Sequence, residues 1–173
     1  MNLRRLAVWA TAFCLLLAYV LFFQRPDTTK EKGAGEDLPR MVTMQQEELG
    51  SIMIEHNGRK VGLERTGGTW MVTSSPGSGV NQDTVNSLVS AIMDTVVINM
   101  VEEHPANPAQ YGFDKPDFSI TLSSQQGQAP CTVLIGNDSP TSTSMYAMIE
   151  SSGSVLLIGT YLRFSLKTFF EKL

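Results

Sequence analysis

The sequence predicts an α+β domain with largely antiparallel strands, preceded by an N-terminal transmembrane helix. Three observations support this prediction. From residue 41 onward, short apolar runs alternate between periods of two and 3.6 residues, and turn residues separate them. No strand–helix–strand repetition demands a parallel sheet. Near the start of the chain, residues 6–23 (LAVWATAFCLLLAYVLFF) carry no charge, which is typical of a membrane span.

The predicted span would extend roughly 27 Å as a helix, close to the thickness of the hydrocarbon core of a bilayer. Its apolar run is longer than the roughly 7 to 15 residues of a secretory signal, and no small-x-small cleavage site follows it. We therefore expect a retained anchor. A cleaved signal and a buried helix of a soluble protein are the alternatives. The expected anchor side chains are Leu6, Trp9, Phe13, Leu16, Tyr19 and Phe23.

The segments on either side of the span differ in charge. Residues 1–5 form a basic tail, and residues 24–40 are a polar, charged tether with glycine and proline but no aromatic residue. A large domain that follows a single first span favours an amino terminus inside the cell and residues 41–173 outside it. In a bacterium with two membranes, the anchor would lie in the inner membrane and the domain in the periplasm.

The outer domain is acidic. Residues 41–173 contain seven Lys/Arg and thirteen Asp/Glu, a net charge of −6. Nucleic acids and anionic lipid headgroups require a basic surface, so neither is an expected partner. Cys14 lies in the predicted span and Cys131 in a predicted strand, so the sequence indicates no disulfide framework.

The domain begins with a predicted three-stranded meander. Its strands are residues 51–56, 60–65 and 69–73. Asn57-Gly58 and Gly67-Gly68 separate them, and such pairs favour tight hairpin turns because these residues enter positive φ at low cost.

A helix is predicted after the loop at residues 74–79. Asn81 is its expected N-cap, and Asp83 is placed to interact with the helix dipole. The apolar face expected to pack on the sheet consists of Val85, Leu88, Val89, Ile92 and Val96.

The second half of the domain is predicted to be mostly strands. The β-branched stretch 96–101 predicts one strand, and alternating or apolar runs predict four more at 118–123, 132–135, 145–149 and 154–158. A closing helix over residues 161–172 is expected to bury one side, formed by Leu162, Leu166, Phe169 and Phe170.

Several turns follow an order that resembles a known family. Tyr111-Gly112-Phe113-Asp114-Lys115-Pro116 is followed by a strand, then by Ile135-Gly136-Asn137, then by Tyr146-Ala147. Over roughly residues 50–170 the chain resembles the bacterial family called domain of unknown function 4340, whose members often repeat this module. The resemblance implies structural turn roles for Tyr111, Gly112, Asp114, Pro116, Gly136, Asn137 and Tyr146.

The family resemblance also implies a role. It suggests a membrane-anchored protein encoded beside components of ABC-type transporters, including those linked to gliding motility. It implies no catalytic residues.

The residues themselves contain no convincing catalytic or metal motif. No G-x-S-x-G elbow or S-x-x-K pair is present. The histidines His56 and His104 are too far apart in sequence for an H-x-x-x-H motif, and no C-x-x-C motif occurs. Residues 136–144 lack the lysine of a phosphate loop, so a wide hairpin loop is favoured. Asp114, Asp117 and Asp138 are a weak calcium hypothesis because no D-x-D-x-D-G series organises them. We expect no enzyme activity, metal or cofactor.

Two functional hypotheses remain. The first is an accessory or scaffold module that binds an integral membrane protein of an envelope complex, through an edge strand or the exposed face of the closing helix. The second is a periplasmic domain that holds a small ligand or lipid in an apolar cavity. Methionines 53, 71, 93, 100, 145 and 148 are either core residues, which is the favoured interpretation, or an adaptable binding face.

Overall fold

The computed structural model describes residues 38–73 and 81–173. The predicted span at residues 6–23 and most of the predicted tether lie outside these residues. Within the two described ranges, no helix is long and apolar enough to cross a membrane.

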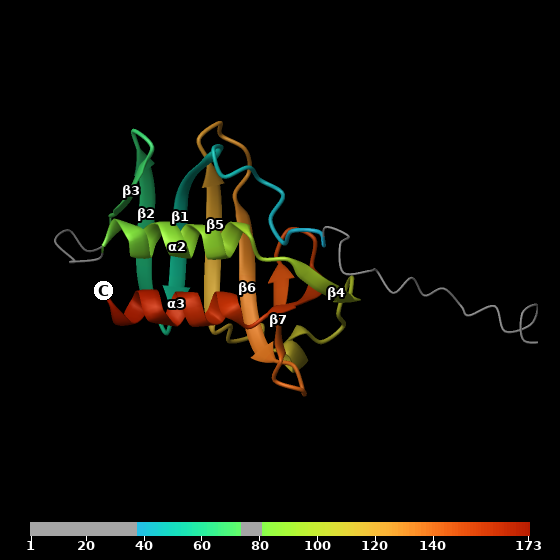
Figure 1. Cartoon of the computed structure of the whole chain (residues 1–173). Helices are drawn as coiled ribbons and strands as arrows, with labels where there is room; N and C mark the ends of the chain where they lie inside the picture. The colour runs from blue at the N-terminus through green and yellow to red at the C-terminus, as the bar shows by residue number, and fades with distance from the viewer. Residues whose placement is uncertain (1–37, 74–80) are drawn as a thin grey trace, which may run out of the picture. The chain divides into compact units, whose positions relative to one another are not determined.

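One antiparallel sheet of eight strands forms the centre of the domain (Figure 1). The strand order is β3-β2-β1-β5-β6-β7-β8-β4, and every neighbouring pair is antiparallel. The predicted α+β class with largely antiparallel strands is therefore confirmed for the domain. The strands are β1 (Leu49–His56), β2 (Arg59–Thr66), β3 (Thr69–Val72), β4 (Val97–Glu102), β5 (Phe118–Ser124), β6 (Cys131–Asp138), β7 (Ser144–Ile149) and β8 (Ser154–Gly159).

The predicted meander is confirmed as β1, β2 and β3. Both connections are two-residue turns in which each residue has positive φ: 50° and 76° at Asn57 and Gly58, and 58° and 85° at Gly67 and Gly68. Two consecutive positive φ values match the right-handed twist of the flanking strands, so the turn residues set the register of this part of the sheet.

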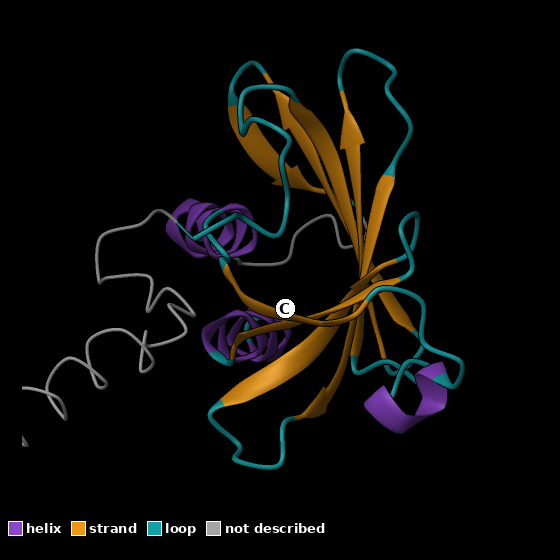
Figure 2. Cartoon of the chain, turned by 90° about the vertical axis from the view of Figure 1, so that its right-hand side faces the viewer, coloured by secondary structure: helices purple, strands orange, loops and turns teal. Residues whose placement is uncertain are grey.

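Two helices, α2 (Gln82–Met93) and α3 (Tyr161–Glu171), cover one face of the sheet. They lie side by side across the strands in Figure 1, and both lie on the same side of the sheet in Figure 2. Their apolar faces pack on alternate residues of the central strands, such as Ile52, Ile120 and Ile135, which are all nearly inaccessible to solvent.

The helix α2 begins where the sequence predicts and ends at Met93, just before the β-branched stretch 96–101 that the sequence predicts as a strand. Its apolar spacing alone would extend it to Val96. The Asn81 side chain accepts a hydrogen bond from the Asp83 N–H, as expected of an N-cap. Val96, expected on the buried helical face, lies beyond the helix and is 37% exposed. The reason is that α2 stops at Met93 and the β-branched residues after it favour an extended backbone.

The opposite, outer face of the sheet is crossed by the segment from β4 to β5. Because β4 lies at the edge and β5 at the centre, residues 103–117 pass β8, β7 and β6. A short 3₁₀ helix, η1 (Pro108–Tyr111), lies in this segment on the side of the sheet away from α2 and α3 (Figure 2). Residues 111–116, the first turn of the family pattern, lie in this crossing segment.

Candidate functional site

A groove runs between α2 and α3 on the surface of the domain. Two hollows form it, of about 520 Å³ and about 330 Å³. Ser87 and Tyr161 line both hollows, so the two are neighbours on the surface. We call the surface lined by Asp83, Ser87, Ser90, Ala91, Tyr161, Leu162 and Phe164 the interhelical groove.

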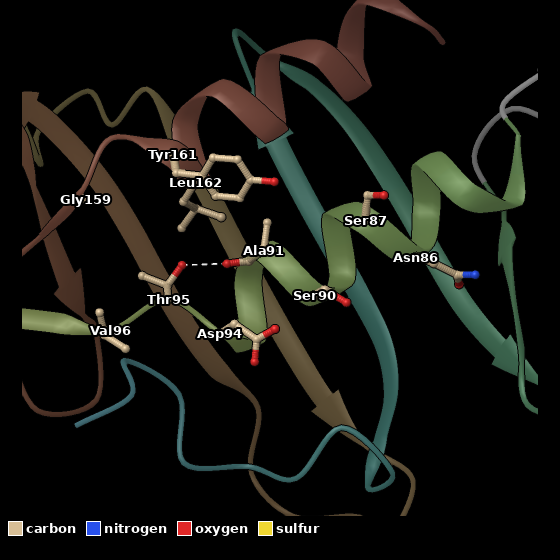
Figure 3. Close-up of a pocket in the computed structure, with 10 residues that line it drawn as sticks. All are labelled: Asn86, Ser87, Ser90, Ala91, Asp94, Thr95, Val96, Gly159, Tyr161 and Leu162. Atoms are coloured by element: carbon tan, nitrogen blue, oxygen red, sulfur yellow. Dashed lines mark hydrogen bonds between the residues drawn. The ribbon is translucent and has the colours of Figure 1, made fainter. Parts of the chain in front are cut away.

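The walls of the interhelical groove differ in size. The α2 wall of the larger hollow has small side chains at Ser87, Ser90 and Ala91, with Asn86 and Asp94 beside them (Figure 3). The α3 wall carries Tyr161 and Phe164, which are both 67% exposed. Large exposed aromatic side chains beside a row of small ones form a surface into which the side chains of another molecule can pack.

The α3 helix is held on the sheet by an arginine. Arg163 Nη1 donates to Asp138 Oδ1, and Nη2 donates to the carbonyl of Gly136. Arg163 Nε lies 3.0 Å from Asp117 Oδ2, and the Arg163 side chain is only 13% exposed. Paired groups of this kind fix the position of a helix because a buried guanidinium is costly without its acceptors.

Asp117 is the centre of a wider polar cluster at this end of the sheet. Besides Arg163, Lys167 Nζ lies 3.9 Å from Asp117 Oδ2. The Asp117 carbonyl accepts a 2.6 Å hydrogen bond from His56 Nδ1, and His56 Nε2 accepts from the Asn57 amide at 3.0 Å. The imidazole also stacks on Phe118, with ring centroids 4.2 Å apart. Both ring nitrogens of His56 are therefore engaged in holding the turn.

Of the three acids in the calcium hypothesis, Asp117 and Asp138 both form ion pairs with the Arg163 guanidinium at one end of the sheet. Asp114 is exposed and takes no part in these pairs. Across residues 38–73 and 81–173, no group of three or more His, Cys, Asp or Glu side chains is arranged to hold a metal ion.

The turn residues around Tyr111 pack closely against the end of β6. Gly112 has φ 86°, and a Cβ there would lie 2.5 Å from Asn137 Oδ1. A Cβ on Gly136 would lie 2.8 Å from the Phe113 ring and would also clash with the Tyr111 carbonyl. Because both residues are glycines, the turn around Tyr111 can contact the end of β6 directly. A side chain at either position would push the two segments apart.

Aromatic rings extend this contact across the outer face. The Tyr111 and Tyr146 rings meet edge to face, with centroids 4.9 Å apart. The Tyr111 hydroxyl donates to Glu102 Oε2 at 2.9 Å, which ties the crossing segment to the end of β4. This hydrogen bond to a carboxylate, with the nearby negative charge, raises the pKa of Tyr111 above its ordinary value of 10.0.

The family model for Domain of unknown function (DUF4340) matches residues 70–173, more than half of the chain. The chain belongs to this family. The resemblance seen in the sequence is thus confirmed, although the match begins at residue 70 and leaves β1 and β2 outside it. No curated protein and no solved structure matches the chain.

In this DUF4340 member, the structure brings five of the seven motif residues together: Tyr111, Gly112, Gly136, Asn137 and Tyr146. The other two are adjacent to this contact. Pro116 is half-buried, and Asp114 is exposed with no hydrogen bond or ion pair from its carboxylate to any residue that the structure describes. Three residues further on, Asp117 makes the ion pairs, and sequence reasoning assigned it no such role.

The methionines do not form one binding face. Met93 and Met145 are buried in the core and Met148 is half-buried. Met53 and Met71 are exposed on β1 and β3, whereas Met100 is exposed on β4 at the other edge of the sheet.

The loop between β6 and β7 is a hairpin loop, as expected. The Ser139 N–H donates to the Ser144 carbonyl at 2.9 Å. The hydroxyls of Ser139, Thr141, Thr143 and Ser144 form hydrogen bonds with one another at 3.0–3.1 Å. These hydroxyls therefore satisfy each other within the loop.

Proposed function

We propose that this DUF4340 member is a single-pass, membrane-anchored accessory module whose extracytoplasmic domain binds another protein of an envelope complex. An integral membrane protein of an ABC-type transporter assembly is the first candidate partner. The observation that supports the proposal is the interhelical groove, with Tyr161 and Phe164 exposed along one wall. Aromatic side chains on a rigid element are characteristic of the residues that dominate protein–protein binding energy.

The groove is preorganised for such a contact. Leu162, Leu166 and Phe169 of α3 are nearly inaccessible to solvent, and Arg163 joins the same helix to β6. Tyr161 and Phe164 are therefore carried on a helix that needs no folding upon binding. A surface that is already ordered loses less conformational entropy in a complex.

The predicted anchor adds a positional argument. A domain attached to a membrane meets a partner in the same membrane at a much higher effective concentration than a free domain does. A modest groove can then suffice for stable association, which suits an accessory or scaffold role and requires no chemistry from the domain.

The proposal is tested by capture from solubilised membranes. The tagged full chain should recover integral membrane proteins in mild detergent, and the Tyr161→Ser/Phe164→Ser variant should recover at least about tenfold less, because two aromatic anchors are lost. A Met53→Ser/Met71→Ser variant is the matched control, since it removes exposed apolar side chains from β1 and β3. Equal recovery by the groove variant, or no recovery by the natural chain, would contradict the proposal.

A small-ligand role is the second candidate. The larger hollow, about 520 Å³, has the volume of a small-molecule pocket. Its lining includes Ala91, Val96, Leu162 and Tyr161 but no methionine, and it lies between the helices at the surface. A bound molecule detected by native mass spectrometry of the purified chain, and lost when Ser90→Trp fills the hollow, would favour this role over protein binding.

A further inference from the structure

The strand β4 is an edge of the sheet with an apolar exposed surface. Ile98, Met100 and Val101 are 49%, 50% and 40% exposed. Edge strands of monomeric proteins usually carry lysine or proline, or are covered, because unpaired backbone groups attract other strands. Residues 97–101 contain no charged residue and no proline.

In the part of the chain that the structure describes, residues 39–41 cover only the beginning of this edge. The Met41 N–H donates to the Thr95 carbonyl, and the Val97 N–H donates to the Pro39 carbonyl, both at 2.8 Å. Arg40 and Val96 form an isolated antiparallel bridge. Pro39 has no N–H to return to Val97, so the pairing ends there. Within residues 38–73 and 81–173, no segment pairs with the edge from Ile98 to Glu102, where the strand ends.

Residues 39–41 also show how a further strand can be added. They pair with this edge in the antiparallel direction. An added strand that continues along Ile98–Glu102 has room for about five residues before the chain bends at Glu103. The midpoint of this open edge is Met100.

We propose that the open edges of two copies of this chain pair antiparallel about a two-fold axis at Met100 and form a homodimer with a continuous sheet. This inference uses a different surface from the interhelical groove and does not depend on the proposed partner.

Self-complementarity is the first argument for a second copy. The register of β4 against β8 shifts at Ile98 and again at Val101, which increases the local twist of the strand. A strongly twisted edge deters an ordinary flat strand, but a second copy of β4 has the same twist. The two copies would also bury the same apolar side chains against each other.

Charge is the second argument. Antiparallel pairing brings the acidic end of one β4, at Glu102 and Glu103, next to the beginning of the other copy's open edge. Arg40 lies at that beginning. Its side chain is 63% exposed, and its ion pair with Asp94, at 3.5 Å, is exposed to solvent on both sides. Two-fold symmetry repeats this pairing of opposite charges at both ends of the contact.

The connection to the predicted span is the third argument. Leu38 directly precedes the segment that pairs with β4, and 37 residues, including the predicted span, come before it. Around a two-fold axis at Met100, Leu38 of both copies would lie beside the contact. Two copies anchored in one membrane can therefore form this contact, and sharing a membrane raises their effective concentration.

The test is a disulfide placed on the proposed axis. Met100→Cys is introduced into the full chain in membranes, in a background with Cys14→Ser and Cys131→Ser, and is oxidised mildly. Directly opposed residues of antiparallel strands are within disulfide reach, so most of the protein should become a covalent dimer. Met71→Cys is the matched control: it replaces an exposed methionine on β3, at the opposite edge, and should give only background dimer.

A second change tests the contact surface. Ile98→Lys, added to Met100→Cys, should lower dimer yield at least about tenfold because a lysine on an edge strand opposes pairing. Val101→Lys serves in its place if the melting temperature shows that Ile98→Lys is unfolded. Equal yields from Met100→Cys and Met71→Cys, or undiminished yield in folded lysine variants, would overturn the proposal. The groove variant Tyr161→Ser/Phe164→Ser should still form the disulfide, which separates this result from the capture experiment.

Discussion

Gly136 lies where the fold leaves no room for a side chain. Its Cα faces the Tyr111 carbonyl and the Phe113 ring, while its own carbonyl accepts from Arg163. The residue thus lies where the crossing segment of the outer face and the α3 helix of the other face both reach β6. The sequence identified Gly136 through the family pattern, and the structure supplies the physical reason for a glycine at this position.

Gly136→Ala should therefore destabilise the domain by about 2–3 kcal/mol, since the added methyl group overlaps backbone and ring atoms that cannot move independently. The measurement is chemical denaturation of the full chain. Gly159→Ala is the matched control, because a Cβ there meets nothing within 4 Å, and it should change stability by less than about 1 kcal/mol. Similar effects of the two substitutions would contradict the role assigned to Gly136.

The Asp117 cluster could not be predicted from the sequence. His56 is 61 residues from Asp117, and Arg163 is 25 residues from Asp138. Their meeting depends on β5 pairing beside β1 and on α3 docking over the end of β6, and no local pattern encodes either event. Residue type alone placed His56 at the end of a strand and could not predict its partner.

Asp117→Asn should cost about 2 kcal/mol of folding stability, because the Arg163 guanidinium would lose a carboxylate in a largely buried site. Glu55→Gln is the control. It removes an ion pair at 3.3 Å with Lys60 in which both side chains are well exposed, and it should change stability by less than about 0.5 kcal/mol. Thermal unfolding of both variants at one pH makes the comparison, and equal losses would refute a clamping role for Asp117.

At the scale of elements, local chemistry predicts most of the fold. Asn57-Gly58 and Gly67-Gly68 predict the hairpin turns, and the alternation of Phe118, Ile120 and Leu122 predicts the buried side of β5, which are all confirmed. The sequence places Val96 both on the helical face and in the strand 96–101, and the helical placement is wrong. Its spacing fits a helix, but the β-branched residues at 96 and 97 favour an extended backbone, which pairs with residues 39–41. Apolar spacing contains no information on such a partner.

The two helices offer a direct comparison of capping. Asn81 caps α2 through a hydrogen bond to the Asp83 N–H, whereas Thr160 makes no side-chain cap bond at the start of α3. Asn81→Ala should therefore destabilise the domain by about 1 kcal/mol, and Thr160→Ala by much less. Urea titration would measure both changes. A loss from Thr160→Ala as large as that from Asn81→Ala would show that the difference in caps has no energetic consequence.

At the scale of the molecule, the sequence predicts the fold class but not the strand order. Strands that follow one another pair in the meander and from β5 to β8, as short connections favour. The two long connections break this rule. The α2 helix carries the chain from β3 at one edge to β4 at the other, and residues 103–117 return it to the centre. Each crossing passes over several strands of the sheet, so its path depends on the whole domain and not on a local pattern.

The last prediction concerns the attachment of the whole chain to a membrane. The full chain should stay in the membrane fraction after washes with high salt and alkaline carbonate, because the predicted span of 18 uncharged residues would be held by the hydrophobic effect. The acidic residues 41–173 cannot provide that attachment through anionic lipids. A variant without residues 6–23 should therefore be released, whereas replacement of these residues by an unrelated apolar span of equal length should retain it. Release of the full chain by salt alone, or retention of the deletion variant, would refute an integral anchor at residues 6–23.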